Sequence, residues 1–212
     1  MRLGFIGTGK IASSVIVGIC TSKIYFKRIL ISRRNKHISQ NLKKRFRKVD
    51  IAKTNQEIVD KCNWIFLAVT PKIGAKILPK LNFRSNQKII SFISTINLVQ
   101  LKKIVRKKAK IIRALPLPPI SLRRGPVPIF PPDKEAKIFF NHLGTAVEIS
   151  NERLFTNFWC MTAMMAPYYE ILNTLSKWLS SKGLKNADTQ KYITSLFSAM
   201  SEDAVLNFLQ LN

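Results

Sequence analysis

The chain has 212 residues, 46% of them hydrophobic, and a formal net charge of +25. This length suits one medium domain, or a nucleotide-binding domain with a small appendage, and the apolar content supports a packed core and argues against disorder. Cys20, Cys62 and Cys160 lie far apart, and only two histidines are present, which argues against disulfides, zinc and a histidine-rich metal site. We therefore expect no metal, and buried thiols in a reducing cytoplasm, since the first residues form no signal-peptide pattern.

The positive charge allows two interpretations. Lysines and arginines are spread along the whole chain, for example at Lys43-Lys44-Arg45 and Arg123-Arg124. Solvated helix faces are favoured, because no helix-turn-helix, RNA-binding aromatic signature or zinc module accompanies the charge. The alternative is a surface that binds a polyanion such as a nucleic acid. In either case the field attracts phosphorylated or carboxylate ligands.

From residue 1 to about 150, short apolar runs alternate with polar amphipathic ones, which is typical of βαβ units on a parallel sheet. The predicted strands are Arg2–Ile6, Arg28–Ser32, Val49–Ala52, Trp64–Val69, Ile89–Ile93, Lys110–Ala114, Val127–Phe130 and Thr145–Ile149. Helices are predicted to begin near Gly9, Lys36, Asn55, Pro71 and Leu98. The clusters Pro116–Pro119 and Pro126–Pro132 exclude regular helix and indicate a stiff connecting loop.

The pattern changes after about residue 151. Leu154–Leu179 is a long apolar stretch that ends in the helix-stop sequence Ser180–Gly183, and a second amphipathic helix is predicted over Ala187–Leu211. A membrane span fits the length of the first stretch, but Asn157 and Pro167 interrupt it. We favour a helix that is buried all round, at a subunit interface or against the sheet.

A G-x-G-x-x-A motif stands where the first predicted strand turns into a helix, and its residues are Gly7, Thr8, Gly9, Lys10, Ile11 and Ala12. In a Rossmann unit the first glycine makes the tight turn, the second lets the backbone approach a pyrophosphate, and the alanine lets the helix pack on its strand. A plain strand–turn–helix is the alternative. The apolar strand before the motif and the apolar helix after it favour dinucleotide binding, and Lys10 is expected to neutralise phosphate.

These patterns together predict the fold class α/β. A Rossmann-type N-terminal domain with a mostly parallel sheet is expected over residues 1–150, and it binds the cofactor. A short all-α segment is expected over residues 151–212, where it serves dimerisation or the substrate.

The end of the second strand indicates which cofactor is bound. NAD enzymes generally place Asp or Glu there to accept hydrogen bonds from the ribose hydroxyls. Here the residues are Ser32, Arg33 and Arg34, with no carboxylate. Ser32 can donate to a 2′-phosphate, and either arginine can clamp it with charge-assisted hydrogen bonds. The sequence therefore predicts NADP rather than NAD.

Several segments match the motifs of one family in chain order. They are Gly7–Ala12 (G-x-G-x-M-A in the family), Thr54–Val59, Leu67–Lys72 (L-A-V-K-P-Q), Ser91–Thr95 (S-I-A-A-G), Arg113–Pro119 (R-x-M-P-N-T-P) and Thr162–Tyr168 (S-G-S-G-P-A-Y). The chain thus resembles pyrroline-5-carboxylate reductase, the NADPH-dependent enzyme that closes proline biosynthesis. The resemblance implies that Asn55 binds the ribose, that Ala68, Val69 and Pro71 line the nicotinamide side, and that a homodimer completes the site.

The substrate half departs from the family pattern. Leu117 stands in place of the Asn of P-N-T-P, and Ala163 and Met165 replace two glycines of S-G-S-G-P. The family's later T-S-P-G-G-T segment has no counterpart before Asn212, so the helical segment is expected to be truncated relative to the family. The cofactor half is expected to be intact and the substrate half to be altered.

Four hypotheses follow for the function. The first is an NADP-dependent oxidoreductase that transfers hydride from NADPH to the C=N bond of 1-pyrroline-5-carboxylate, giving proline, and the second is a reductase of another small imine or carbonyl. The third is a catalytically degenerate NADP-binding module with a regulatory or partner-binding role, and the fourth is a polyanion-binding protein. The catalytic residues are unknown. Thr162 and Tyr168 are candidates to hydrogen-bond the substrate, with a purely packing role as the alternative.

Overall fold

The computed structural model describes residues 1–106 and 109–207. It divides into two compact units, Met1–Trp159 and Cys160–Asn212, each described by itself. That residues 1–150 and 151–212 act as separate functional domains stays a prediction.

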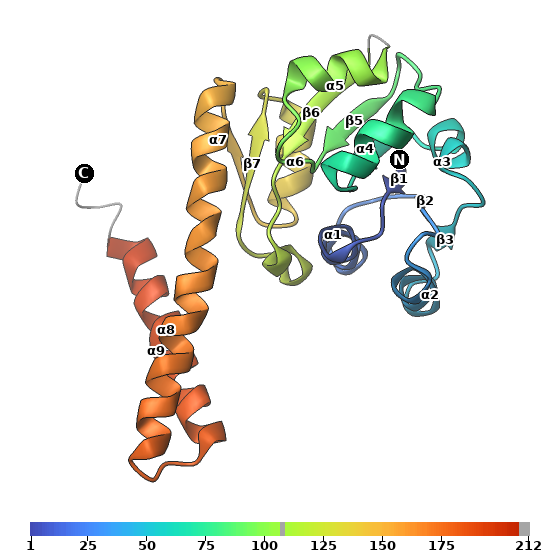
Figure 1. Ribbon diagram of the computed structural model, residues 1–212. Helices are drawn as coiled ribbons and strands as arrows, with labels where there is room; N and C mark the ends of the chain where they lie inside the picture. The colour runs from blue at the N-terminus through green and yellow to red at the C-terminus, as the bar shows by residue number, and fades with distance from the viewer. Residues whose placement is uncertain (107–108, 208–212) are drawn as a thin grey trace. The chain divides into compact units, whose positions relative to one another are not determined.

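An eight-stranded sheet forms the centre of the first unit within the described residues (Figure 1). Its spatial order is β3-β2-β1-β4-β5-β6-β7-β8, and every neighbouring pair is parallel except β6 and β7. The strands are β1 (Arg2–Ile6), β2 (Arg28–Ile31), β3 (Val49–Ile51), β4 (Trp64–Leu67), β5 (Lys88–Ser91), β6 (Lys110–Ala114), β7 (Pro126–Phe130) and β8 (Thr145–Glu148). The predicted α/β class with a mostly parallel sheet is confirmed.

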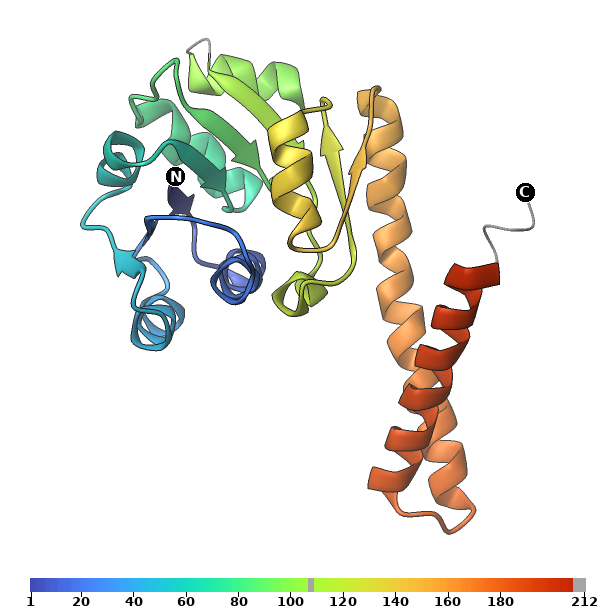
Figure 2. The same ribbon diagram turned by 180° about the vertical axis from the view of Figure 1, so that it is seen from behind.

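Helices cover both faces of the sheet, which is why its central strands are apolar on both sides (Figures 1 and 2). One face carries α1 (Lys10–Thr21), α2 (Lys36–Arg45) and α6 (Lys134–Asn141). The other face carries α3 (Asn55–Lys61), α4 (Pro71–Ile77) and α5 (Leu98–Val105). On the first face the rings of Phe5 and Phe66 stack with centroids 4.4 Å apart, which ties β1 to β4 at the centre of the core.

The helix starts follow from local capping. The side chains of Asn35, Thr54 and Asn97 accept backbone N–H groups in the first turns of α2, α3 and α5. Pro71 begins α4, where a missing N–H leaves no intrahelical bond unmade. All five predicted helix starts therefore lie at or next to the observed ones.

The predicted strand over Val127–Phe130 is confirmed, whereas the stiff loop expected over the proline clusters is wrong for two of its parts. Pro118–Leu122 forms a 3₁₀ helix, and Pro126–Phe130 is strand β7 inside the sheet. Pro128 takes part through its carbonyl, which accepts the N–H of Leu115 at 3.2 Å. The antiparallel pairing of β7 with β6 covers only two residue pairs, so the N–H groups that proline lacks are not needed there.

The second unit is helical. After α7 (Glu152–Met161) come a 3₁₀ turn, α8 (Met165–Ser181) and α9 (Asn186–Asn207). The predicted stop after α8 is observed, with Gly183 at a φ of +93°. The end of the second predicted helix, residues 208–211, lies outside the described residues.

The apolar helical stretch is largely exposed in the single chain, and its predicted burial at a subunit interface stays a prediction. In α7 and α8 most large apolar side chains are exposed, among them Met161, Tyr169 and Trp178, and Phe155 is the buried exception. Helix α8 packs mainly on α9, for example through Tyr168 and Phe197, whose ring centroids lie 5.8 Å apart. Within residues 1–106 and 109–207, no helix is long and apolar enough to cross a membrane.

The cysteines differ in burial. Cys62 is buried and Cys20 half-buried, and burial raises the pKa of the Cys62 thiol to about 12 and that of Cys20 to about 11. Cys160 is exposed, so the expectation of buried thiols is wrong there.

A buried ion pair fixes α6 to the sheet. The Asp133 carboxylate caps α6 by accepting the N–H of Ala136 at 2.7 Å, and it accepts Lys88 Nζ at 2.7 Å. Lys110 Nζ lies 2.5 Å from its second oxygen. Burial alone would raise the pKa of Asp133, but the hydrogen bonds from Lys110 and Lys88 outweigh it and lower the pKa to about 2.

This carboxylate predicts a specific loss of stability in acid. Its pKa is depressed in the folded state, so its contribution of about 2 kcal/mol is present above the unfolded pKa and is lost as the pH falls from about 4 to about 2. Urea unfolding across this range measures the loss. Asp133→Asn should make the free energy of unfolding less dependent on pH in this range. Asp50→Asn, which removes a more exposed ion pair with Arg28, should leave the pH dependence unchanged. If the free energy of unfolding fell equally with pH in wild type and in Asp133→Asn, the loss of stability in acid would not come from Asp133.

Candidate cofactor groove

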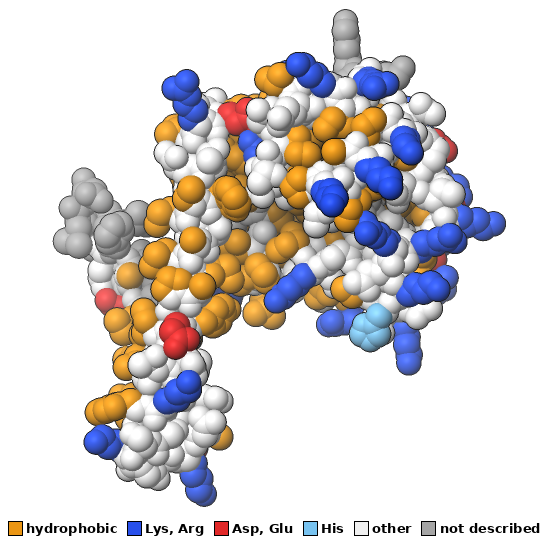
Figure 3. Space-filling model, viewed as in Figure 1, with side chains coloured by type: hydrophobic (Ala, Val, Ile, Leu, Met, Phe, Trp, Pro, Cys, Tyr) orange, Lys and Arg blue, Asp and Glu red, His pale blue; other side chains and the backbone are white. Residues whose placement is uncertain are grey.

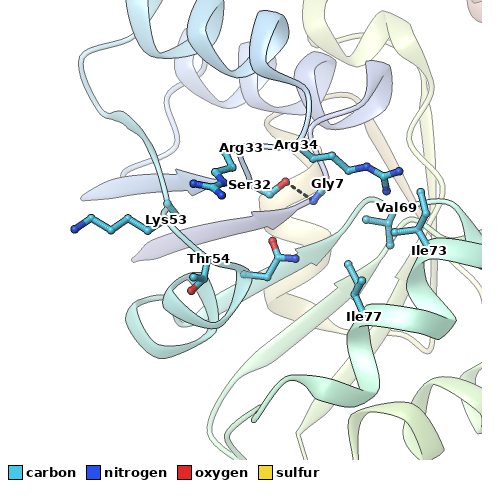
Figure 4. Close-up of a pocket in the computed structure, with 11 residues that line it drawn as sticks. Gly7, Ser32, Arg33, Arg34, Lys53, Thr54, Val69, Ile73 and Ile77 are labelled. Carbon is cyan, nitrogen blue, oxygen red and sulfur yellow. Dashed lines mark hydrogen bonds between the residues drawn. The ribbon is translucent and has the colours of Figure 1, made fainter.

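The carboxyl ends of β1, β2 and β4 meet where the strand order reverses, which is the position at which open α/β sheets bind ligands. Gly7 leaves β1 with a φ of +103°, and a Cβ there would collide with the Ala68 carbonyl. The Gly7 N–H donates to Ser32 Oγ at 2.9 Å (Figure 4), and Thr8 Oγ1 donates to the Ser32 carbonyl at 2.9 Å. These contacts bind the first turn of the motif to the end of β2.

The N-terminus of α1 is open to a ligand. Gly9 is the capping residue, with extended backbone and no side-chain cap. A Cβ on Gly9 would meet no atom within 4 Å, so nothing in the fold requires glycine there. Ala12 is buried and seats the helix on the core. The first-turn N–H groups and the helix dipole thus favour an anion beside Gly9, which fits a pyrophosphate.

Adjoining cavities follow this edge of the sheet and share Gly7, Gly9, Arg34, Ala68 and Val69 among their walls. We call them together the cofactor groove. The structure brings together along it all the residues predicted to hold the cofactor, namely Gly7, Thr8, Gly9, Lys10, Ile11, Ala12, Ser32, Arg33, Arg34, Asn55, Ala68, Val69 and Pro71. Their binding roles stay predictions.

Asn55 is placed by the start of α3. The Thr54 hydroxyl accepts the Glu57 N–H at 3.1 Å, and a Glu57 carboxylate oxygen accepts the Lys53 N–H at 2.7 Å. Hydrogen bonds from the Lys61 side chain and the Lys53 backbone lower the pKa of Glu57, so the carboxylate stays an acceptor. The turn that presents Asn55 to the groove is therefore held from both ends.

The groove is positively charged. None of the described residues that line it is acidic. Five of them are basic, namely Lys10, Arg33, Arg34, Lys36 and Lys53. On the face shown in Figure 3, the Lys and Arg side chains of the first unit are scattered rather than gathered in one patch. This distribution of charge agrees with basic side chains on solvated helix faces together with one groove that attracts phosphate. Binding of a polyanion stays a hypothesis.

Sequence reasoning missed part of the lining. Ile73 and Ile77 on α4 form an apolar wall beside Val69, and Lys53 lines the groove next to Thr54. The signal for the wall was available, because these isoleucines are four residues apart and share one face of a helix that begins at the sheet edge.

The substrate side is less complete. Thr162 lies in the 3₁₀ turn before α8, and Tyr168 lies on α8 in ring contact with Tyr169 and Phe197. Both belong to the second unit, which is described by itself. Their catalytic role stays a prediction. Within residues 1–106 and 109–207, no group of three or more His, Cys, Asp or Glu side chains is arranged to hold a metal ion.

Comparison with known proteins agrees with this geometry. Residues 2–97 match the family model described as NADP oxidoreductase, coenzyme F420-dependent. Pyrroline-5-carboxylate reductase 3 of Danio rerio is 31% identical over 130 residues, which cover 59% of this chain and 44% of the relative. The chain spans about half the length of the curated relatives it matches.

Solved structures show the same fold. The 1-pyrroline-5-carboxylate reductase of Streptococcus pyogenes superimposes with a TM-score of 0.81 at 22% identity, covering 96% of this chain and 79% of that one. The Plasmodium falciparum pyrroline carboxylate reductase, solved with NADP bound, gives a TM-score of 0.82 at 19% identity, covering 96% and 78%.

The sheet order, the Gly7 turn and the open start of α1 define a Rossmann-type protein with a dinucleotide groove. In sequence and in fold the chain is similar to pyrroline-5-carboxylate reductases.

The two motif glycines should respond in opposite ways to substitution. Gly9→Ser adds a good helix cap in open space, so the free energy of unfolding should stay the same or rise by up to about 1 kcal/mol. The cap would occupy the N–H groups that a pyrophosphate needs, so NADPH affinity should fall at least about tenfold. Gly7→Ala should instead destabilise the fold by about 2 kcal/mol or more, through its positive φ and the Ala68 collision.

Urea unfolding and NADPH fluorescence titration measure the two quantities independently. Unchanged NADPH affinity in a stable Gly9→Ser protein would contradict the role of the α1 N-terminus.

Proposed function

We propose that this chain binds NADPH in the cofactor groove and is an oxidoreductase that reduces a carbon–nitrogen double bond. The observation that carries the proposal is Gly9, an exposed glycine that the fold does not require. It lies beside a helix start without a side-chain cap, in a groove whose charged lining residues are all basic. A dinucleotide explains all three features, because its pyrophosphate needs close backbone approach, N–H donors and positive charge.

The preference for NADP over NAD rests on the end of β2. Ser32 Oγ accepts the Gly7 N–H, so its own hydrogen is available to a phosphate oxygen. Arg33 and Arg34 follow it, and no carboxylate stands there to accept from a ribose 2′-hydroxyl. A 2′-phosphate would satisfy these donors, whereas a free hydroxyl would leave them without an anion.

We infer that the substrate is 1-pyrroline-5-carboxylate and the product proline, which would place the chain in amino-acid biosynthesis. The names of its relatives support this substrate. Bound NADPH supplies the hydride to the imine carbon, while the nitrogen takes up a proton from solvent. The chain itself needs to orient the cofactor, exclude water and hold the substrate carboxylate.

Two alternatives have specific support in the substrate half. Leu117, Ala163 and Met165 replace the family's polar or glycine residues, and Met165 is half-buried while Met164 is exposed. These changes favour either a reductase of a different small imine or carbonyl, or an NADP-binding module that has lost turnover. Both alternatives keep the cofactor groove; the first differs from the main proposal in its substrate, and the second in having no turnover.

We also propose that the helical unit forms a homodimer, in a protein that acts in the cytoplasm. Ile171, Leu175 and Trp178 on α8 and Tyr192 and Leu196 on α9 are exposed in the single chain. A soluble monomer rarely leaves so much apolar surface uncovered. A second copy would bury these faces symmetrically, and a closed two-fold pairing is the commonest arrangement.

Cofactor oxidation tests the enzyme proposal. Purified protein with NADPH and 1-pyrroline-5-carboxylate should give a saturable loss of NADPH absorbance, because both the hydride donor and the acceptor are then present. A reductase of established activity, assayed under the same conditions, is the control. NADPH binding without turnover on this or related imines would favour the degenerate module, and turnover on another imine only would favour the altered substrate.

Sedimentation velocity tests the dimer. Ile171→Asp on α8 should shift a dimer toward monomer, since it places a charge in the proposed interface. Ile138→Asp on α6, an equally exposed isoleucine of the first unit, is the matched control and should leave the dimer intact. A monomeric wild type would contradict the proposal.

A further inference from the structure

The cofactor groove reaches the loop between β5 and α5. Phe92, Ile93 and Ser94 begin this loop and wall the cavity that also contains Pro71. Ser32 lines the cavity at the ends of β2 and β3. Since the sheet order is β3-β2-β1-β4-β5, a dinucleotide with its 2′-phosphate beside Ser32 would place its nicotinamide toward the β5–α5 loop.

Arg113, on the neighbouring strand β6, holds this loop in place. Its side chain is only 5% exposed, and its Nη2 donates to the Ser94 carbonyl at 2.5 Å. Its Nη1 donates to Glu152 Oε1 at 2.7 Å. The same carboxylate oxygen accepts the N–H of Leu98, the first residue of α5, at 2.7 Å. The guanidinium and the carboxylate together therefore fix the loop at Ser94 and at Leu98.

Arg113 occupies its position at a cost in stability. The Phe155 ring centroid lies 4.6 Å from its guanidinium carbon. Its Nε is buried and, among the residues that the structure describes, has no hydrogen-bond partner. A buried donor without a partner is unfavourable, and a well-packed apolar residue would avoid that cost. Packing alone therefore does not explain an arginine here, whereas the need to hold the Ser94 carbonyl does.

We propose that Arg113 and Glu152 are positioning residues for hydride transfer, which act through the β5–α5 loop. They hold Ser94 and its neighbours at the wall where the nicotinamide and the imine would meet. The groups proposed to bind the phosphates lie at the ends of β1 and β2, so the pair should affect turnover more than NADPH affinity. This inference rests on the proposed function, since it requires that the groove binds NADPH.

Substitutions of the two residues test the proposal. Arg113→Lys keeps the charge but lacks the planar fork that reaches both the Ser94 carbonyl and Glu152, so the loop should shift. Because small misplacements of reacting groups slow a reaction strongly, the single-turnover rate of NADPH oxidation should fall at least about tenfold, while the Kd for NADPH should change less than about twofold. Glu152→Ala should have the same effect. Glu152→Gln keeps an oxygen that can accept both hydrogen bonds, so its rate should stay within about threefold of wild type.

The fluorescence of bound NADPH gives a second readout that needs no turnover, because the emission comes from the nicotinamide ring. At saturation it should differ from wild type in Arg113→Lys and Glu152→Ala, and match wild type in Glu152→Gln. Glu152 is 27% exposed, so Glu152→Ala still tests the pair if Arg113→Lys does not fold.

Asp133→Asn is the matched control for a general loss of stability. It disturbs another buried ion pair, whose partner Lys88 begins β5, at the opposite end of the strand from the loop. It should lower the free energy of unfolding and leave both the turnover rate and the emission of bound NADPH unchanged.

Folded Arg113→Lys and Glu152→Ala proteins with the wild-type rate and emission would overturn the inference. An equal loss of rate in Asp133→Asn would also overturn it, because lower stability would then be the cause. Wild type that bound NADPH without turnover would contradict the enzyme proposal, while the emission of the variants would still show whether the pair positions the nicotinamide. If wild type did not bind NADPH, both the proposed function and this inference would fail.

Discussion

The close approach of Gly7 to the backbone at Ala68 is the constraint on which the candidate site depends. A side chain at Gly7 would separate the ends of β1 and β4, and the Gly7 N–H would lose its position against Ser32. The backbone at the ends of β1 and β4 would then have to shift. Since each of these strand ends supplies part of the groove lining, the shape of the groove depends on the absence of this one Cβ.

The glycines of the motif thus have separable causes. Gly7 is required by the fold itself, through its positive φ and the contact with Ala68, whereas Gly9 has extended backbone and open space around it. Sequence alone shows two glycines of equal weight. The structure separates the one that maintains the turn from the one that only a ligand would require.

Local signals made most of the first unit predictable from sequence. Strands β1 and β6 have their predicted bounds, because apolar runs between turn residues mark them without reference to the rest of the chain. The starts of α2 and α3 follow from Asn35 and Thr54, whose caps are also local. Over Pro126–Pro132 the apolar run correctly predicted a strand at Val127–Phe130, whereas the loop predicted from the prolines was wrong there, because a proline's effect depends on which N–H groups its neighbours in the sheet require.

Burial of the helical unit and the position of Arg34 could not be predicted in this way. The apolar stretch before residue 179 predicts a helix, but what covers such a helix is decided by another surface, and in this chain α9 covers only part of α8. The direction of an arginine side chain likewise depends on the wall it faces, and Ile73 comes from a helix distant in sequence. Neither is encoded in a local pattern.

Because the chain is strongly basic, the geometry of the groove rather than its charge has to select one anionic cofactor among many. With 36 basic and 11 acidic residues, the whole protein attracts anions of any kind, and such attraction is long-range and unselective. Recognition of one cofactor must therefore come from short-range contacts that only that cofactor completes. In the proposed function the Ser32 hydroxyl makes such a contact, because its direction is set by its hydrogen bond to Gly7 in the same turn that would shape the pyrophosphate site. The proposed selectivity and phosphate binding are thus linked through a single hydrogen bond from the Gly7 N–H to the Ser32 hydroxyl.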